Sequence, residues 1–364
     1  KDIELMKGIK LFDPVIDERE VKKVVKTLKS GFWASGAGSG QVHEFETKFK
    51  TFIHSKSCVA VNSGTAALHL AASLCNIKGK EVILPSLSFV STAHAIMYNG
   101  GTPVFVDVEP DTLCIDPEEI KKKISKKTRC IIPVHFGGIP ADIKRIQKLS
   151  KSNVMIIEDA AHACGSQYNG KKIGSHGDFV CFSFHPVKNL AMPTGGLISI
   201  NNHNYKKITE DLKSKRWCGI SNRKYTDYDV DKIGWNFYMN ELSAAIGLVQ
   251  LQKIKKMNNK RKSIAKIYDK ELNVSKKIPF TSTCVYHLYW ICVRDRNFFR
   301  KKLLEKGIET GTHYKPIHQM SLYKKSVKLP LTEKIAKEIV TIPIHPNLTG
   351  SQIDYIVKTV NRFS

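Results

Sequence analysis

Short apolar runs of strand length alternate with helical patterns from Ser57 to Ile200. The strand-like runs are residues 57–61, 81–84, 103–106, 129–134, 154–159, 179–184 and 196–200. Helical patterns separate the first five runs, at 65–75, 89–97, 117–124 and 141–149. Strands joined by helices form right-handed crossovers, which give a mainly parallel sheet with helices on both faces. The pattern therefore predicts a large α/β domain.

Elements before this region extend the large domain, and the elements after about residue 258 suggest a second, smaller domain. Before the sheet, Asp17 can cap a helix whose apolar residues repeat at helical spacing, namely Val21, Val24, Val25 and Leu28. After the sheet, the expected elements are helices at about 204–217 and 239–257, a strand at 286–293, and helices near 297–306 and 351–362. The pattern changes near residue 258. We therefore expect a large domain at 1–258 and a smaller C-terminal α/β domain at 259–364.

A lysine lies where the backbone is expected to leave the sheet after the run 179–184. Pro186 cannot donate to a β ladder and Gly195–Gly196 is typical of a turn, so Lys188 lies beyond the strand. Sheets of this kind bind ligands beyond the carboxyl ends of their strands. In this apolar segment Lys188 can be a partly desolvated amine able to form a Schiff base, or simply a solvated loop lysine.

Gly64 and Thr65 lie where the first strand gives way to a helix. Glycine permits close approach of the backbone, and the first N–H groups of the helix converge with the hydroxyls of Ser63 and Thr65 at a positive helix end. This arrangement suits a phosphate group. Plain helix capping explains the same residues.

Asp159 ends the fifth strand-like run beside small residues. A carboxylate at an apolar strand end needs a charge partner, because burying it unpaired costs several kcal/mol. A protonated pyridine nitrogen would supply about 4 kcal/mol of attraction, before desolvation, at ~4 Å and an effective dielectric constant of ~20. A metal ion is the alternative partner, since His162 follows three residues later, although no metal-binding motif is present.

Phe89 follows another strand end and can lie flat on an aromatic ring or pack in the core. Taken together, a phosphate cup, a stacking aromatic residue, an aspartate and a lysine supply the contacts that pyridoxal phosphate requires.

Charge and composition exclude some classes of protein. The 364 residues include 58 Lys+Arg and 33 Asp+Glu, a net charge of +25. Such a charge can attract nucleic acid, but the lysines are dispersed over expected polar helix faces, and no nucleic-acid-binding motif is present. The sequence has no apolar run long enough for a membrane span and no signal-peptide core, so we expect a cytoplasmic protein without a membrane partner. Its nine cysteines form no C-x-x-C pair, which favours reduced thiols and no metal.

Ordered motifs along nearly the whole chain resemble those of the DegT/DnrJ/StrS family of sugar aminotransferases. The motifs are LKSGFWASG, VNSGTAALHLA, PSLSFVSTAHAI, VHFGGIPAD, EDAAHACGS, FSFHPVKN, GWNFYMNELSAAIGL, YHLYWICV and HYKPIH. The resemblance implies the type I fold of pyridoxal-phosphate-dependent transferases. This fold has a large domain with a mainly parallel seven-stranded sheet between helices, plus a smaller C-terminal α/β domain.

The resemblance also implies contacts to the cofactor pyridoxal phosphate. Lys188 takes the place of the Schiff-base lysine and proton shuttle, Asp159 that of the partner of the pyridine nitrogen, and Phe89 the ring-stacking place. His162 is expected close to the cofactor. The residues expected to hold the phosphate are Gly64, Thr65 and Ser183.

Further matches concern the partner subunit and the substrate. Asn236 matches an asparagine that reaches the phosphate of the neighbouring subunit, which implies a homodimer with shared active sites. Thr194 and Tyr238 depart from the family pattern, which usually has an acidic residue and often an arginine at these positions. The residues expected to face the sugar nucleotide are His185, His313 and Tyr314.

The implied reaction is a ping-pong transfer of an amino group from glutamate to a nucleotide-linked sugar. The histidine in FSFHPVK and the HYKPIH loop resemble the branch that makes 4-amino sugars for glycans, so we expect a 4-keto-6-deoxyhexose linked to UDP or dTDP. The alternatives are a 3-keto sugar nucleotide, or a non-catalytic regulatory or nucleic-acid-binding protein with this fold. Lys188 argues against the dehydratase branch of the family, which has histidine in its place.

Overall fold

The structure, a computed structural model, describes residues 8–150, 153–324 and 327–364. Its centre is a seven-stranded sheet with the order β1-β9-β8-β5-β4-β2-β3. The strands are β1 (Ser57–Val61), β2 (Glu81–Pro85), β3 (Thr102–Val106), β4 (Thr128–Ile131), β5 (Met155–Asp159), β8 (Phe179–Ser183) and β9 (Gly196–Ile200). β9 pairs antiparallel with both neighbours, and all other pairings in this sheet are parallel. The predicted α/β fold with a mainly parallel sheet is confirmed.

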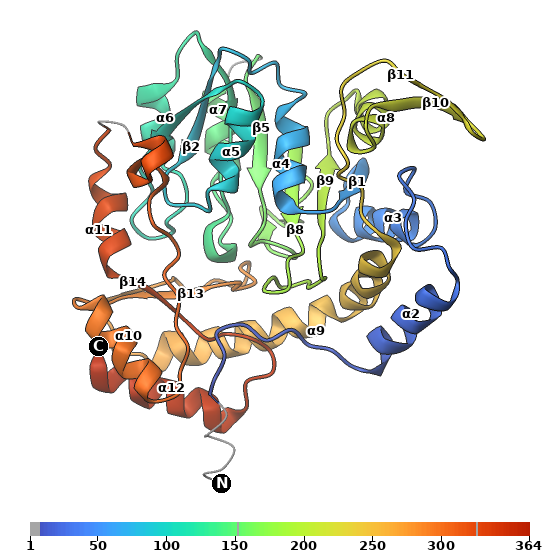
Figure 1. Cartoon of the computed structure of the whole chain (residues 1–364). Coiled ribbons are helices and arrows are strands. Elements are labelled where there is room, and N and C mark those ends of the chain that lie inside the picture. Colours follow the sequence, from blue (N-terminus) through green and yellow to red (C-terminus); the bar gives the residue numbers. More distant parts are fainter. Residues whose placement is uncertain (1–7, 151–152, 325–326) are drawn as a thin grey trace.

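Helices cover both faces of the sheet because its strands are apolar on both sides (Figure 1). In β8, Phe179 and Cys181 pack with α4 (Gly64–Ala72) and α5 (Ser91–Tyr98) on one face. Val180 and Phe182 pack on the other face with α3 (Gln41–Ile53) and α9 (Glu241–Glu271). Successive side chains of a strand alternate between faces, so a continuous apolar run fills both cores. The other large-domain helices are α2 (Glu18–Lys29), α6 (Pro117–Lys123), α7 (Ile143–Leu149) and α8 (Tyr205–Arg216).

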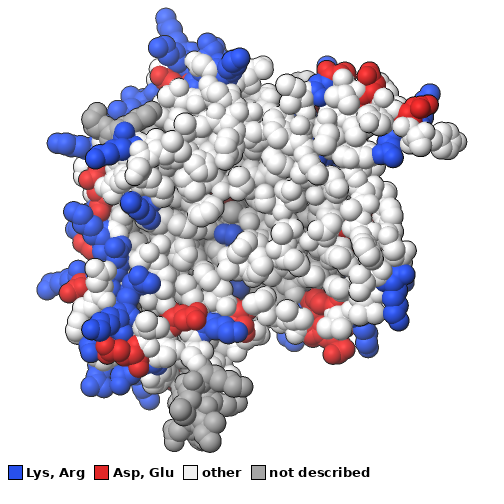
Figure 2. Space-filling view, in the orientation of Figure 1, with Lys and Arg blue, Asp and Glu red and all other residues white. Residues whose placement is uncertain are grey.

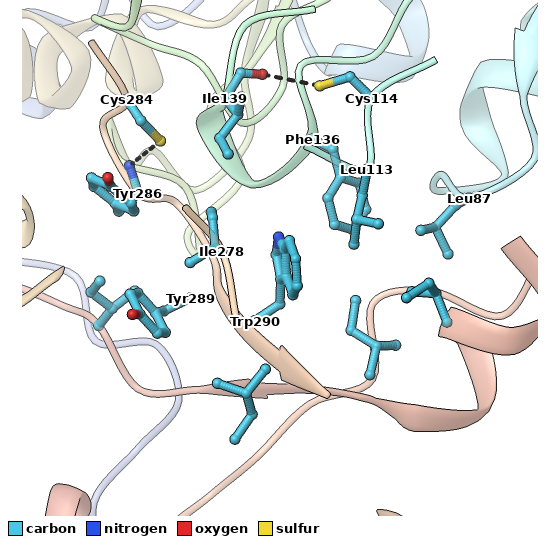
Figure 3. Packing of buried hydrophobic residues seen from close by; sticks show 14 of the residues in the cluster. Leu87, Leu113, Cys114, Phe136, Ile139, Ile278, Cys284, Tyr286, Tyr289 and Trp290 are labelled. Carbon is cyan, nitrogen blue, oxygen red and sulfur yellow. Dashed lines mark hydrogen bonds between the residues drawn. The ribbon is translucent and has the colours of Figure 1, made fainter. Parts of the chain in front are cut away.

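A second sheet carries the C-terminal elements. Its strands are β12 (Lys276–Lys277), β13 (Tyr289–Cys292) and β14 (Ile339–Ile342), accompanied by α10 (Arg296–Glu305), α11 (Pro330–Glu338) and α12 (Gly350–Phe363). Figure 3 shows how Trp290 of β13 packs against Phe136 and Leu113 of the large domain. Helix α9 runs through position 258 without interruption. We keep the division near residue 258 as a proposal, in which both parts share this helix.

Several elements differ from those expected from the sequence. A hairpin of β10 (Ile220–Lys224) and β11 (Asp227–Val230) forms in the segment predicted only as polar, and it projects from the molecule beside α8 (Figure 1). Helices α3 and α11 were not expected. Asp17 does cap α2, through a capping box with Glu20. The apolar side chains of Val21, Val25 and Leu28 are exposed, however, and Val24 is half-buried. The buried residues of α2 are Glu20 and Thr27.

The surface charge is concentrated at the edge of the face shown in Figure 2. Blue side chains gather on the left, over α6, α10 and α11, while the middle of this face is largely uncharged and hollowed. Across the described ranges, no helix combines the length and apolar character that a membrane span requires.

Candidate active site

A cavity of about 430 Å³ opens at the carboxyl ends of the parallel strands. Segments that follow β1, β2, β5 and β8 line it, together with Phe12 and the loop that carries His313. The structure brings together every predicted site residue except Asn236, in agreement with the rule that such sheets bind ligands at this edge. The predicted residues in the wall are Gly64, Thr65, Phe89, Asp159, His162, Ser183, His185, Lys188, His313 and Tyr314.

The carboxylate of Asp159 is buried at the end of β5 and holds only neutral partners. Thr92 Oγ1 donates to Oδ2 at 2.8 Å, and the backbone N–H of Ala161 donates to Oδ1 at 3.2 Å. No ion pair to Asp159 occurs within residues 8–150, 153–324 and 327–364. Burial raises the pKa of this carboxyl, and the two hydrogen bonds oppose the increase. The site therefore favours a bound cation next to Asp159.

Lys188 lies in the loop after β8, with its amine inside the cavity wall. Burial lowers the pKa of this amine to about 8, and the charge of Asp159 opposes the decrease. Its Nζ lies 3.4 Å from Nε2 of His287. A lysine in this environment has a substantial neutral fraction near physiological pH, which a nucleophilic amine requires.

The N-terminus of α4 forms the opposite part of the wall. Ser63 caps the helix by accepting from the N–H of Ala66 at 3.1 Å, so the capping expected from the sequence is present. The first-turn N–H groups of Gly64 and Thr65 have no partner within the helix. A Cβ at Gly64 would lie 2.7 Å from Cβ of Ser183, so only glycine permits this approach of the backbone. Unpaired N–H groups at a helix N-terminus favour an anion here.

His162 is buried and hydrogen-bonded through both ring nitrogens. The N–H of Gly137 donates to Nδ1 at 3.3 Å, and Nε2 lies 3.0 Å from the hydroxyl of Tyr314. Burial, with the charge of Lys188, holds the pKa of His162 well below its usual value. The ring is therefore neutral, with its proton on Nε2, and donates to the Tyr314 oxygen. The Tyr314 hydroxyl proton is left for another acceptor.

The remaining predicted residues of the wall are accessible from the cavity. Phe89 is 57% exposed, so core packing does not explain this aromatic residue. His185 is exposed beside Lys188. His313 Nδ1 and Thr341 Oγ1 share a hydrogen bond of 2.9 Å, and burial lowers the pKa of His313 to about 4. Thr194, one of the departures from the family pattern, also lines the cavity.

Asn236 lies outside the cavity of its own chain. It is exposed in the segment between β11 and α9, where its backbone carbonyl accepts from Asn62 Nδ2 at 3.4 Å. A group of at least three metal-ligating side chains does not occur in the part of the chain that the structure describes, so geometry gives the metal alternative for Asp159 and His162 no support.

Three residues of the site were not expected from the sequence. Thr92 supports Asp159, His287 contacts Lys188, and Phe12 stacks on His287 with ring centroids 5.6 Å apart. His287 belongs to the motif YHLYWICV, which indicated only a strand. Nothing in the local sequence marks Phe12 or Thr92, because each contact depends on packing between distant segments.

Comparison with known proteins gives a consistent assignment. The sequence model of the DegT/DnrJ/EryC1/StrS aminotransferase family matches residues 14–361. The chain is 34% identical to GDP-perosamine synthase of Escherichia coli O157:H7, over 98% of this chain and 99% of that protein. It is 33% identical to an uncharacterized protein of Methanocaldococcus jannaschii, over 96% of each chain.

Solved structures agree with the sequence relatives. The candidate sugar aminotransferase Spr1654 of Streptococcus pneumoniae has been solved in PLP, PMP and apo forms. This chain matches the PLP form with a TM-score of 0.92 at 29% identity, over 98% of each chain. Helicobacter pylori PseC, an aminotransferase involved in pseudoaminic acid biosynthesis, has a TM-score of 0.91 at 29% identity, over 98% of this chain and 99% of that one. The chain therefore belongs to the DegT/DnrJ/EryC1/StrS aminotransferase family, as a sugar aminotransferase whose cofactor is pyridoxal phosphate.

Proposed function

We propose that the protein transfers an amino group from glutamate to a nucleotide-linked 4-keto-6-deoxyhexose and so makes a 4-amino sugar nucleotide. The observation that carries the proposal is one cavity that combines three features: a buried carboxylate with no ion pair among the described residues, a lysine with a lowered pKa, and the N-terminus of α4. The name of the Escherichia coli relative, GDP-perosamine synthase, supports a 4-amino sugar product. The sequence favours UDP or dTDP as the carrier, and this relative adds GDP to the nucleotides to be tested.

The donor set of the cavity fits pyridoxal phosphate. Asp159 lacks an ion-pair partner among the described residues, so it can hold a protonated ring nitrogen. Gly64 and Thr65 offer N–H groups to a phosphate, with Ser183 beside them. The exposed ring of Phe89 offers a stacking face. When bound, the cofactor supplies an electron sink for the transfer.

The chain's own residues would then position groups and move protons. The neutral amine of Lys188 would take a proton from the donor carbon that bears the amino group and release it within the first half-reaction, and in the second half-reaction it would deliver a proton to the sugar carbon that receives the amino group. Asp159 holds the positive charge of the ring nitrogen in place. His162 fixes the oxygen of Tyr314, which leaves the Tyr314 hydroxyl proton to donate to a bound oxygen. His185 and His313, at the wall of the cavity, are proposed contacts for the sugar nucleotide.

The test of the substrate class is a panel of keto sugars linked to UDP, dTDP or GDP, offered with glutamate. We expect a product with the mass of the amino sugar and a nitrogen at C4, located by NMR, together with 2-oxoglutarate. An amine at C3 would overturn the proposed position. Exclusive use of a GDP-linked sugar would contradict the expectation of UDP or dTDP, and use of free keto acids alone would overturn the substrate class.

We also propose a homodimer in which Asn236 completes the partner's site. Apolar side chains are exposed on α2 and on the segment from β10 to Ile233, where Tyr225 is 97% and Ile233 83% exposed. Exposed apolar patches are typical of interfaces between proteins, so each of these two segments is a candidate contact with a second copy. Asn236 follows Ile233 by three residues and lies outside the cavity of its own chain, so its side chain can reach the site of a second copy.

Mixing two impaired variants tests this dimer. Asn236→Ala should weaken activity roughly 10-fold to 100-fold, because one hydrogen bond to a charged phosphate is lost. Refolded together, Lys188→Ala and Asn236→Ala chains should recover about a quarter of wild-type activity, because half of the dimers are mixed and each contains one intact site. Activity is measured on the mixture and on each variant alone. No recovery, or a fully active monomer in sedimentation, would contradict shared sites.

A further inference from the structure

His287 is the one side chain of the C-terminal part whose hydrogen bond reaches the amine of Lys188 among the described residues. The segment that leads into β13 carries it, 99 residues further along the chain, and its Nε2 lies 3.4 Å from Nζ. The ring is buried. The sequence pattern predicted only a strand at this position, and His287 has no role in the proposed reaction.

Neighbours on all sides fix the orientation of this ring. Phe12 stacks on it at 18° between ring planes, and His162 lies 4.5 Å away between centroids. The backbone N–H of His287 donates to the carbonyl of Gly137 at 2.9 Å. A ring held in this way keeps Nε2 directed at Lys188 without a further loss of side-chain entropy.

The ring of His287 makes one hydrogen bond among the described residues, from Nε2 to the amine of Lys188. Nδ1 has no hydrogen-bond partner within the described ranges, and it is buried. Burial and the charge of Lys188 hold the pKa of His287 well below its usual value, so the ring is neutral. An ammonium group only donates, and therefore Nε2 accepts from Lys188 when the lysine is charged. Burying Nδ1 without a hydrogen-bond partner costs free energy of folding. An apolar ring would fill the same space without that cost, so packing alone does not explain a histidine here.

We propose that His287 is a positioning residue for Lys188, holding the lysine amine by accepting a hydrogen bond at Nε2. The inference rests on the proposed role of Lys188 in the transfer. In this role a residue of the C-terminal part orients the lysine directly, and Phe12 stabilises the orientation of the His287 ring by stacking on it.

The consequence is a measurable change in the acidity of Lys188. A hydrogen bond to the ammonium form favours that form, so losing it lowers the pKa of the lysine below about 8. The other titratable groups that face Lys188, which every variant retains, are Asp159, His162, His185 and His313.

The experiment measures Lys188 in the full-length, cofactor-free protein by competitive acetylation followed by mass spectrometry across pH 6 to 10. Exposed Lys315 in the same digest serves as the internal reference. In His287→Phe we expect the pKa of Lys188 to fall by about one unit, which raises its neutral fraction at pH 7 about fivefold. His287→Gln places an amide oxygen near the position of Nε2 and should return the profile toward that of wild type. His287→Met, a more adaptable apolar side chain, provides the same comparison if the phenyl ring prevents folding.

The outcomes separate this inference from the proposed reaction. A lowered pKa in the apolar variant together with recovery in His287→Gln supports the positioning role. Identical profiles in wild type and the apolar variant overturn it, even if the protein aminates a sugar nucleotide. Conversely, an absence of transamination leaves the labelling result fully interpretable, because that measurement requires neither cofactor nor substrate.

Discussion

Replacement of Lys188 by alanine is expected to abolish covalent attachment of the cofactor and to lower the amination rate by roughly 10³-fold or more. The lysine amine lies in the cavity beside Asp159 and His287, and its pKa of about 8 leaves a reactive neutral fraction. Burial disfavours its charged form, so the change should not lower the stability of the cofactor-free protein. Stability is measured by thermal unfolding, and activity by amino sugar formation.

Borohydride reduction followed by peptide mapping locates the attachment site in the wild-type protein. We expect the label on Lys188 and its complete loss in Lys188→Ala. Lys301→Ala is the matched control, because Lys301 is exposed on α10 and lies outside the cavity wall. A label on any other lysine would show that the proposed site is wrong.

Asp159→Asn is expected to lower activity by up to about 10³-fold. The loss reflects the attraction of a carboxylate for a protonated ring nitrogen, about 4 kcal/mol at ~4 Å with an effective dielectric constant of ~20. The amide oxygen can still accept from the N–H of Ala161, and the amide NH₂ can donate to Thr92 Oγ1. Both hydrogen bonds are therefore kept, the second with its direction reversed. The measurements are cofactor affinity and amination rate, which should fall together.

The stability of the cofactor-free Asp159→Asn protein should change in the opposite direction. The pKa of Asp159 is raised on folding, so its ionised form disfavours the folded state once pH exceeds the carboxyl's unfolded value. Asparagine removes that cost, and the melting temperature at pH 7 should be unchanged or higher. A clear loss of stability with normal cofactor affinity would contradict the assignment.

The neighbouring carboxylate provides the matched comparison. Glu158 points to the other face of β5, where His135 Nε2 lies 2.8 Å from Oε2 and Gly177 donates its backbone N–H to Oε1. Nδ1 of His135 already accepts from the N–H of Ala141 at 3.0 Å, so Nε2 carries the proton. In Glu158→Gln the amide NH₂ group would face either His135 Nε2–H or the N–H of Gly177, both of which are donors. One hydrogen bond is therefore lost, which should cost about 1–3 kcal/mol of stability. Cofactor affinity of the folded fraction should persist.

Much of this site could be predicted from local sequence. A strand end followed by proline and glycine located Lys188, an apolar run ending in a carboxylate located Asp159, and a Ser-Gly-Thr turn located the N-terminus of α4. The rule that parallel strands present ligand sites at one edge then brought these residues together. These residues do line one cavity in the structure. They could be located from the sequence because strand length, alternation and turn residues are properties of short segments.

The residues that support the site could not be predicted in this way. Phe12, Thr92 and His287 reach it through packing of segments far apart in the chain, and no local pattern around them indicates a site. The exposed apolar stripe of α2 gives the same lesson, because helical spacing at Val21, Val25 and Leu28 predicts a face that will be covered without saying what covers it.

By itself, the sequence determined the mainly parallel α/β sheet and the set of reactive side chains at its edge. The tertiary structure alone decided that Asp159 has neutral hydrogen-bond partners, that His287 contacts the amine of Lys188, and that Asn236 lies outside its own cavity. The physical reason is that hydrophobic periodicity specifies an element and its buried face within a few residues. Which polar atoms meet, and how strongly burial shifts their pKa values, depends on the packing of whole elements against one another.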